Sequence, residues 1–274
     1  LDPDFVLALT AQAELYQRQG RFDRQVAWLQ RAAEQDPDNF GVYFDMLWTF
    51  LDLEDPAAIE RLRRHMLTRV DEDHLNIAWV DAMSTMGARN PDAALEHIAW
   101  IYDAMGRLPF VKGIEGYLYS HKGDAARARE AFEIYDPRLF DPERWQDGIV
   151  DHPRDACLAG WMLINTGEEA KGRALVNDAV RYLEEELPRY VDHAQNWGQE
   201  ECYLIQGDVD AAMAIVETRF EHRHLTGWHF YEKQGHYAPL LREPRFQELD
   251  RQRRAIMAEQ RAAIAALDFT EAGP

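Results

Sequence analysis

Apolar residues recur along most of the chain at the spacing of amphipathic helices, separated by short breaks rich in Gly, Asp and Pro. The clearest segment runs from residue 6 to residue 39 and reads VLALTAQAELYQRQGRFDRQVAWLQRAAEQDPDN. Gly20 divides it, because glycine ends a helix readily in the left-handed conformation. Asp36-Pro37 ends the second half, since proline lacks an amide donor and restricts the residue before it. The pattern predicts two helices joined by a tight turn.

Similar breaks return at nearly regular intervals, which indicates a tandem repeat. They are separated by 34, 33, 36, 44 and 40 residues, so the period starts near 34 and lengthens towards the C-terminus. We therefore expect helical hairpins whose connecting loops grow longer late in the chain. The predicted turn positions are Gly20, Glu54, Gly87, Gly123, Gly167 and Gly207.

The segment 6–39 resembles the tetratricopeptide repeat, a 34-residue helical hairpin with small or apolar residues at set positions. The residues that carry the resemblance are Leu9, Ala13, Tyr16, Gly20, Phe22, Leu29, Ala32 and Pro37. A second resemblance lies near the C-terminus, where HYAPLLREPRFQEL starts at His236 and is similar to the closing phrase of tetratricopeptide arrays in bacterial multidomain regulatory proteins.

The resemblance implies an all-α fold, a right-handed α-solenoid of about six hairpins with a C-terminal capping helix. We expect one domain over 1–274, with regular repeats over about 6–134 and longer, irregular repeats over about 150–243. A capping helix over about 245–267 and a tail over 268–274 complete it. The apolar stripes carrying Trp28 and Trp100 are expected in the core.

In this family the first helix of each hairpin lines a concave groove, and the resemblance carries that rule onto this chain. In the first repeat it selects Thr10, Glu14, Gln17 and Arg18. The aromatic and polar residues that it selects in the later repeats form the predicted peptide or ligand groove: Phe44, Trp48, Asp81, Tyr117, Trp161, Asn165, Trp197 and Glu201. Aromatics beside carboxylates suit an extended peptide with apolar and basic side chains. The alternative is that these aromatics pack against neighbouring hairpins.

Composition limits the classes of molecule that the protein could bind and the compartment in which it is expected. The formal net charge is -19, which works against non-specific binding to nucleic acid or to an anionic membrane surface and allows a basic protein partner. The only cysteines are Cys157 and Cys202, without a Cys-x-x-Cys motif, so we expect no disulfide framework and a cytoplasmic location. The alternative is that these two cysteines form one bridge.

The sequence offers no catalytic constellation, no cofactor motif and no metal-binding spacing. Only Ser84 and Ser120 could serve as serine nucleophiles, and neither lies in a Gly-x-Ser-x-Gly elbow. The histidines between residues 222 and 236 do not follow a zinc pattern. We predict a non-enzymatic module that binds a protein or peptide, belonging to a bacterial regulatory or scaffold protein. The alternatives are a small-molecule sensor closing around Trp228 to Tyr237, and a self-associating module such as a homodimer.

Overall fold

The described part of the computed structural model consists of helices and the loops between them, which confirms the predicted all-α class. The structure describes residues 5–88, 90–186, 198–228, 231–232 and 235–265. The chain divides into two compact units, each with its own packed interior. Unit 1 comprises residues 1–97, 222–229 and 249–274, and unit 2 comprises residues 98–221 and 230–248. The expectation of one continuous solenoid over the whole chain stays a prediction.

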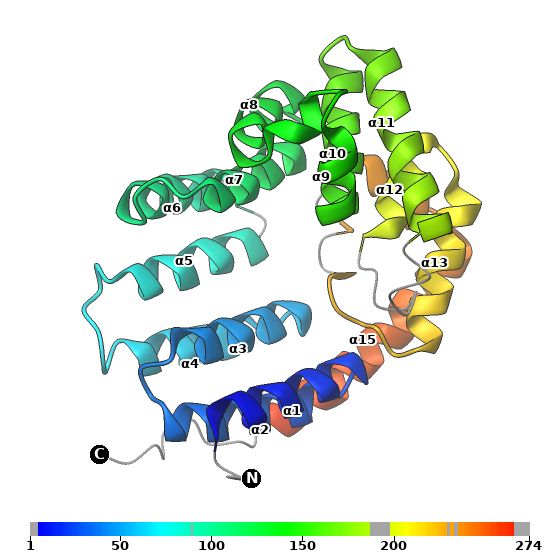
Figure 1. Ribbon diagram of the computed structural model, residues 1–274. Coiled ribbons are helices and arrows are strands. Elements are labelled where there is room, and N and C mark those ends of the chain that lie inside the picture. The colour runs from blue at the N-terminus through cyan, green and yellow to red at the C-terminus, as the bar shows by residue number, and fades with distance from the viewer. Residues whose placement is uncertain (1–4, 89, 187–197, 229–230, 233–234, 266–274) are drawn as a thin grey trace. The chain divides into compact units, whose positions relative to one another are not determined.

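The helices pair into six successive hairpins, in agreement with the predicted number (Figure 1). They are α1 (Val6–Arg18) with α2 (Phe22–Gln35), α3 (Phe40–Asp52) with α4 (Pro56–Met66), α5 (Leu75–Gly87) with α6 (Pro91–Ala104), α7 (Pro109–His121) with α8 (Ala125–Tyr135), α10 (Pro153–Asn165) with α11 (Glu169–Arg181), and α12 (Gln199–Gln206) with α13 (Val209–Glu221).

Shorter elements lie in the stretches predicted to be irregular, and one long helix ends the described chain. The short elements are the 3-10 helix η1 (Pro137–Phe140), α9 (Trp145–Asp151), the π-helical turn η2 (Tyr182–Glu186), the 3-10 helix η6 (Gly235–Tyr237) and α14 (Ala238–Leu241). The last helix, α15 (Pro244–Ala265), corresponds to the predicted capping helix.

The hairpin turns follow from local sequence. Gly123 has a φ of 74°, a left-handed conformation that costs glycine little. The next residue, Asp124, accepts the amide N–H of Arg127 through its carboxylate and so caps the start of α8. The same pair of roles falls to Gly207 and Asp208 between α12 and α13. Gly87 departs from the prediction, because it lies within α5 instead of in the turn.

Glu54 shows how a turn without glycine is held. Its φ of 52° is unfavourable for a residue with a Cβ. Its carboxylate accepts a hydrogen bond from Arg253 of α15 at 2.5 Å, and Arg253 is 2% exposed. Burial acts to raise the pKa of Glu54, but Arg253 and then Arg254 outweigh it, so that the pKa lies below its ordinary value. The ion pair gives this strained turn a role in anchoring α15.

Helix α15 makes a second contact within unit 1. The Gln260 side chain donates to the carbonyl oxygen of Gly20 at 2.7 Å and accepts from the amide of Phe22 at 2.6 Å. It therefore satisfies backbone groups at the turn between α1 and α2 that the helices leave unpaired. Helix α15 therefore forms hydrogen bonds with the turns of both of the first two hairpins.

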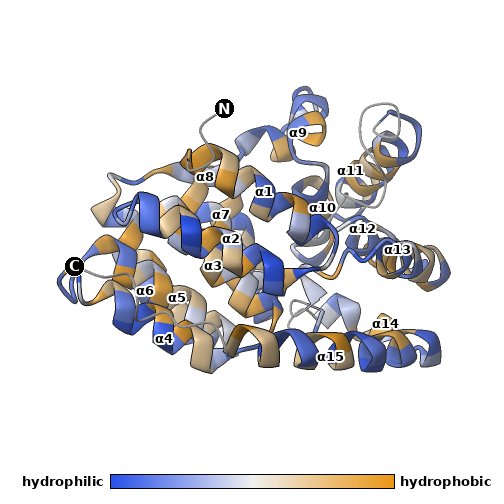
Figure 2. Cartoon of the chain, turned by 90° about the horizontal axis from the view of Figure 1, so that it is seen from below, coloured by the Kyte–Doolittle hydropathy of each residue, from blue (hydrophilic) through white to orange (hydrophobic). Residues whose placement is uncertain are grey.

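The helices bury one apolar face and leave the other polar, as the hydropathy colouring shows (Figure 2). In unit 1 the core includes Phe22, Val26, Leu47 and Phe50, each at most 1% exposed. The predicted core position of Trp100 is wrong, because its side chain is 46% exposed, and α6 instead buries residues such as Ile98.

In unit 2 the core gathers around α10, which packs against α8, α9, α11 and α12. Close approach of α10 and α11 depends on Gly160, where a Cβ would lie 2.3 Å from a methyl carbon of Val176 and 2.9 Å from the carbonyl oxygen of Gly172. The packing of this hairpin therefore requires a residue without a side chain at position 160.

The two cysteines are joined, which is the single bridge that the sequence left open as an alternative. Cys157 on α10 and Cys202 on α12 form a disulfide across 45 residues of chain, with both side chains fully buried. Sequence spacing could not reveal the pair, because it is brought together by the packing of two hairpins. The bond removes the cysteine argument for a reducing compartment, since buried structural disulfides persist in oxidising surroundings.

We expect the double substitution Cys157→Ala/Cys202→Ala to lower the free energy of unfolding by about 4 kcal/mol, because closing a loop of 45 residues restricts the unfolded chain. Guanidinium denaturation of the oxidised protein and of the variant measures the difference, and the reduced wild type serves as the control. Two titratable thiols in the denatured, unreduced protein would contradict the assignment.

Candidate functional site

A hollow of about 420 Å³ lies within unit 1, between the first helices of the first two hairpins. Helix α1 supplies six of its ten lining residues, and α2 and α3 supply two each. We call it the α1–α3 groove, and its lining residues are Leu7, Thr10, Ala11, Ala13, Glu14, Gln17, Gln25, Leu29, Asp45 and Trp48.

The apolar side of this groove is held in place by aromatic packing. The Trp48 ring lies edge to face against Phe44, with ring centroids 5.9 Å apart, and Phe44 makes the same kind of contact with Trp79 at 6.0 Å. Trp79 is 3% exposed, so this chain of rings starts in the core and ends at the groove. Such pairs orient aromatic side chains beyond what burial alone would do.

The polar side of the groove carries an unsatisfied acceptor. Gln25 is 3% exposed, and its side-chain oxygen Oε1 has no hydrogen-bond partner among the described residues. A buried amide oxygen without a donor is unfavourable, so the packing of the chain leaves one hydrogen bond of Gln25 unmade beside the groove.

Asp45 adds a carboxylate whose charge is disfavoured. The residue as a whole is exposed, but neighbouring protein atoms partly desolvate its carboxyl group, and the negative charge of Glu14 acts in the same direction. Together they raise the pKa of Asp45 to about 6. Glu14 itself pairs with Arg18 one turn along α1, at 2.5 Å, with side chains 57% and 44% exposed.

Four residues that the groove rule of the family resemblance selects lie at this hollow in unit 1, and their role in binding stays a prediction. Thr10, Glu14, Gln17 and Trp48 line the groove, whereas Phe44 supports Trp48 from the side. Asp81 is bound by Arg63, whose Nε donates to its carboxylate at 2.6 Å.

Sequence reasoning missed Gln25 and Asp45. Gln25 occupies a position where the repeat usually has a small alanine, and that departure was the signal available. Asp45 lies three residues before Trp48 on the same helix, so helical spacing alone would have brought it towards the groove.

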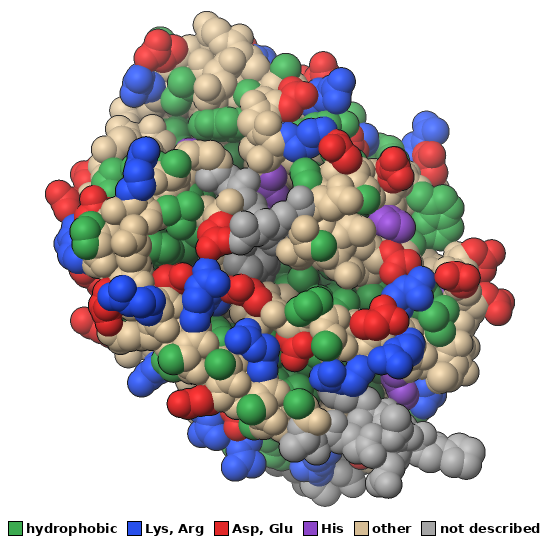
Figure 3. All heavy atoms as spheres, turned by 180° about the vertical axis from the view of Figure 1, so that it is seen from behind, with side chains coloured by type: hydrophobic (Ala, Val, Ile, Leu, Met, Phe, Trp, Pro, Cys, Tyr) green, Lys and Arg blue, Asp and Glu red, His purple; other side chains and the backbone are tan. Residues whose placement is uncertain are grey.

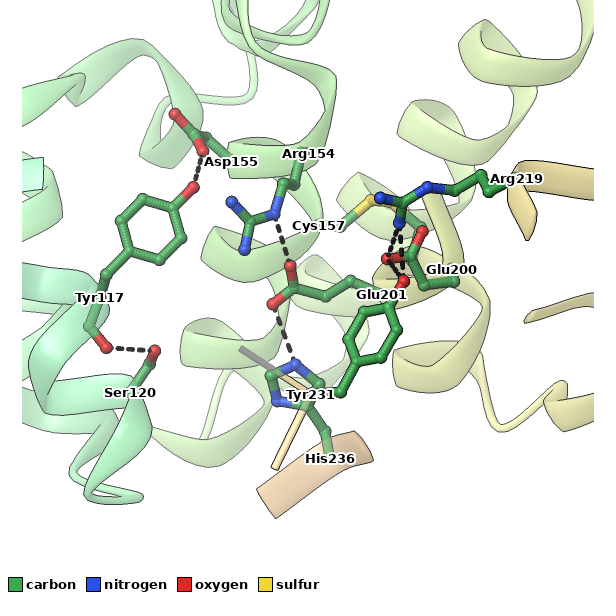
Figure 4. Close-up of polar contacts among 11 residues, drawn as sticks. Tyr117, Ser120, Arg154, Asp155, Cys157, Glu200, Glu201, Arg219, Tyr231 and His236 are labelled. Carbon is green, nitrogen blue, oxygen red and sulfur yellow. Dashed lines mark hydrogen bonds and ion pairs between the residues drawn. A yellow bond between two sulfur atoms is a disulfide. The ribbon is translucent and has the colours of Figure 1, made fainter. Parts of the chain in front are cut away.

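A second polar cluster lies in unit 2 and is buried (Figure 4). Glu201 at the start of α12 accepts from Arg154 at 2.8 Å and lies 2.9 Å from Nε2 of His236. The Glu201 side chain is fully buried, which acts to raise its pKa, but Arg154 and His236 outweigh this effect and lower the pKa to about 2. Glu201 therefore does not line an open groove, which corrects the prediction for this residue.

The neighbouring Glu200 belongs to a parallel set of bonds. Its carboxylate accepts from Arg219 at 2.9 Å and from the hydroxyl of Tyr231 at 2.7 Å. Arg219 also donates to the Tyr231 hydroxyl, at 2.6 Å, and all three side chains are 1% exposed. Burial raises the pKa of Tyr231 well above its usual value, so this hydroxyl stays a donor. These bonds compensate the desolvation of both charges.

Tyr117 is also engaged inside unit 2 and does not face a partner. Its hydroxyl donates to Asp155, which accepts a second hydrogen bond from the hydroxyl of Tyr135 at 2.9 Å. The Tyr117 ring packs edge to face on Phe132, and the guanidinium of Arg154 lies 4.8 Å from its centre. For Tyr117 the alternative of packing between hairpins fits the structure.

The remaining predicted groove residues lie at the edges of this cluster. Trp161 packs against the His236 ring with centroids 5.9 Å apart, and the exposed Asn165 donates to the carbonyl oxygen of Trp161 at 2.8 Å. Trp197 lies outside the described residues. The predicted track is thus divided between the two units: Phe44, Trp48 and Asp81 belong to unit 1, and the others belong to unit 2.

Charges on the outer surface are mostly paired locally. On the face drawn in Figure 3, basic and acidic side chains are interspersed. Many are neighbours on one helix, such as Arg173 with Glu169 at 2.8 Å. Exposed pairs of this kind contribute little to stability or recognition. By contrast, the α1–α3 groove has two carboxylates and no Lys or Arg among its lining residues.

Within the described residues, no helix is long and apolar enough to cross a membrane, and no group of His, Cys, Asp and Glu is arranged to hold a metal ion.

Comparison with known proteins identifies the first hairpin. The tetratricopeptide repeat model matches residues 7–39, which cover nearly all of α1, all of α2 and the connection that leads to α3. This part of the chain is therefore similar to a tetratricopeptide repeat. The comparison with curated proteins finds no match. Among solved structures, the crystal structure of the APC/C hetero-tetramer Cut9-Hcn1 aligns with 89% of this chain and 55% of its own, at 14% identity and a TM-score of 0.41.

We expect Glu201→Gln to lower the free energy of unfolding by about 3–5 kcal/mol at pH 7, because Arg154 would remain buried without its counter-charge. The matched control Glu169→Gln removes an exposed carboxylate and should cost less than about 1 kcal/mol. Urea denaturation measures both.

The ion pair between Glu201 and Arg154 also predicts that the free energy of unfolding depends on pH. A carboxyl group whose pKa falls on folding stabilises the protein above its unfolded pKa, and this contribution is lost as the pH falls through the folded value. The stability difference between wild type and Glu201→Gln should therefore shrink from pH 4.5 towards pH 2. A difference that does not change with pH would contradict the ion pair.

Proposed function

We propose that this chain is a non-enzymatic interaction module and that its α1–α3 groove binds an extended segment of a partner protein. Tetratricopeptide hairpins present the first helix of each pair to a guest, and in unit 1 these are the helices that form the hollow. The observation that supports the proposal most strongly is the hollow of about 420 Å³ with an unpartnered, buried acceptor on Gln25.

The chemistry of the groove favours a peptide over a small rigid ligand. It combines an apolar wall at Trp48 and Leu29 with separate polar groups from α1, α2 and α3. Alternating apolar and polar contacts of this kind suit the side chains of an extended backbone. The buried carboxylates of unit 2 serve as structural ion pairs, and the groove has no nucleophile placed beside a base.

The similarity of the C-terminal phrase to regulatory arrays extends the proposal. The module belongs to a bacterial regulatory or scaffold protein, in which partner binding is coupled to another domain. A cytoplasmic location stays a prediction, which the oxidation state of the cysteines tests.

A small-molecule site around Trp228 to Tyr237 receives less support. Trp228, Tyr231 and Tyr237 are each at most 3% exposed, so their side chains are packed in the interior of their own units.

Selection of random twelve-residue peptides displayed on phage tests the groove. We expect enriched peptides to bind the wild type and to lose at least about tenfold in affinity with Trp48→Ala, since a buried aromatic anchor contributes more than ~1.4 kcal/mol to binding. Isothermal titration calorimetry measures the affinities.

The matched control is Trp100→Ala, which removes an exposed tryptophan that does not line the groove and should leave affinity unchanged. Equal affinity of the wild type and a folded Trp48→Ala variant would show that peptides bind elsewhere. Failure to enrich any peptide would contradict the proposed function.

Self-association is the second candidate, favoured by apolar side chains on and next to α1. Phe5, Leu7 and Leu15 are 54%, 68% and 53% exposed. If they form a homodimer contact, light scattering at about 100 µM protein should give twice the monomer mass, and Leu15→Ser should restore the monomer. A monomeric wild type would exclude this candidate.

A further inference from the structure

The residues that line the α1–α3 groove are themselves acidic, independently of the negative net charge of the whole chain. Its charged lining residues are Glu14 from α1 and Asp45 from α3. The described residues that line the groove include no Lys or Arg, whereas the face drawn in Figure 3 mixes both signs. Two carboxylates facing one hollow repel each other, and a cation placed between them would relieve that repulsion.

Gln25 adds an independent observation from the second helix of the hairpin. Its side chain is almost completely buried and lines the hollow, and Oε1 lacks a donor among the described residues. An amide oxygen can only accept a hydrogen bond, so the group that completes this site must carry N–H or O–H. A carboxylate or phosphate ligand would meet two like charges and an acceptor, and is excluded on both grounds.

We propose that the α1–α3 groove is a recognition pocket for one cationic side chain, arginine or lysine, of the bound segment. This inference rests on the proposed function and names the residue class that the groove selects. The positive group is held by the carboxylates of Glu14 and Asp45 and donates to Oε1 of Gln25. Its aliphatic stem lies along Leu29 and Trp48, in the way that long basic side chains bury their methylenes.

The ion pair between Arg18 and Glu14 does not block this pocket. Both side chains are about half exposed, so the pair is screened by water and can be exchanged for a partner's cation. Arg18 itself is not part of the groove lining. The exchange gives Glu14 a cation both before and after binding.

Binding should depend on pH through Asp45. Helix α1 presents Glu14, paired with Arg18, and α2 presents the neutral Gln25; α4 and α5 also pack on α3 but supply no lining residue. Only the ionised carboxylate attracts the guest, and the pKa of Asp45 is about 6. At pH 5 about one molecule in eleven carries that charge, so affinity should fall about tenfold from its value at neutral pH.

A pair of short peptides tests the pocket. The probes are acetylated, amidated pentapeptides of sequence Ala-Leu-Arg-Leu-Ala and its citrulline counterpart, which keeps the shape and most donors of arginine but has no charge. Nuclear magnetic resonance of the ¹⁵N-labelled chain follows the Trp48 indole and the amides of α1 and α3. We expect the arginine peptide to bind at least tenfold more tightly than the citrulline peptide at pH 7.

Substitutions in the groove test which residues cause the preference for the arginine peptide. Asp45→Asn should reduce the preference for arginine to less than about threefold, and Glu14→Gln should reduce it partly. The matched control Glu60→Gln removes one exposed carboxylate from α4 and should leave the preference intact. If a variant fails to fold, the affinities of the two peptides for the wild type still show whether the groove prefers a positively charged side chain.

The possible outcomes separate this inference from the proposed function. If both peptides shift Trp48 equally, the groove binds peptides but the cationic pocket is wrong. If the preference persists unchanged in Asp45→Asn and at pH 5, the charge is recognised elsewhere. If neither these probes nor the phage-selected peptides perturb α1 and α3, both proposals fail.

Discussion

A left-handed residue between paired helices is the constraint on which the remaining structure depends, and among the described residues it is found at Gly20, Glu54, Gly123, Gly167 and Gly207. It reverses the chain within a few residues, so the second helix must pack directly on the first. Gly123 and Gly207 adopt this conformation readily, and the following aspartates cap the next helix. Where glycine is replaced by Glu54, the unfavourable backbone is tied to Arg253 of the last helix. In unit 1 such turns bring α1 against α2 and α3 against α4, and residues of α1, α2 and α3 line the groove.

The two units use their charged groups differently. In unit 2 the buried carboxylates of Glu200 and Glu201 each accept a hydrogen bond from an arginine, and Tyr231 and His236 provide a second contact to them. Oε2 of Glu200 nevertheless has no hydrogen-bond partner among the described residues, as is true of Oε1 of Gln25 in unit 1. In the α1–α3 groove the carboxylates of Glu14 and Asp45 line a hollow of about 420 Å³. We assign structure to the first cluster because its carboxylates are paired with cations inside the chain, and binding to the second because its carboxylates line open space.

Much of the fold could be predicted from the sequence, because hairpin turns and helical stripes are local features. The period of the turns gave the six hairpins, and the closing phrase after His236 preceded a final helix at Pro244–Ala265. Register rules also placed Thr10, Glu14 and Trp48 on the groove.

The sequence could not predict contacts between residues far apart in the chain. The disulfide joins residues 45 positions apart, and the burial of Glu201 depends on Arg154 and His236 from other elements. Only packing decides whether a position at a groove register stays open, as at Trp48, or is covered, as at Glu201.

Hydrogen–deuterium exchange with and without a phage-selected peptide tests the central claim most directly, since it locates the bound surface without a substitution. The account predicts slower amide exchange in residues 6–18 and 40–52, with little change in 153–181. Protection confined to the later hairpins, with α1 and α3 unchanged, would contradict it.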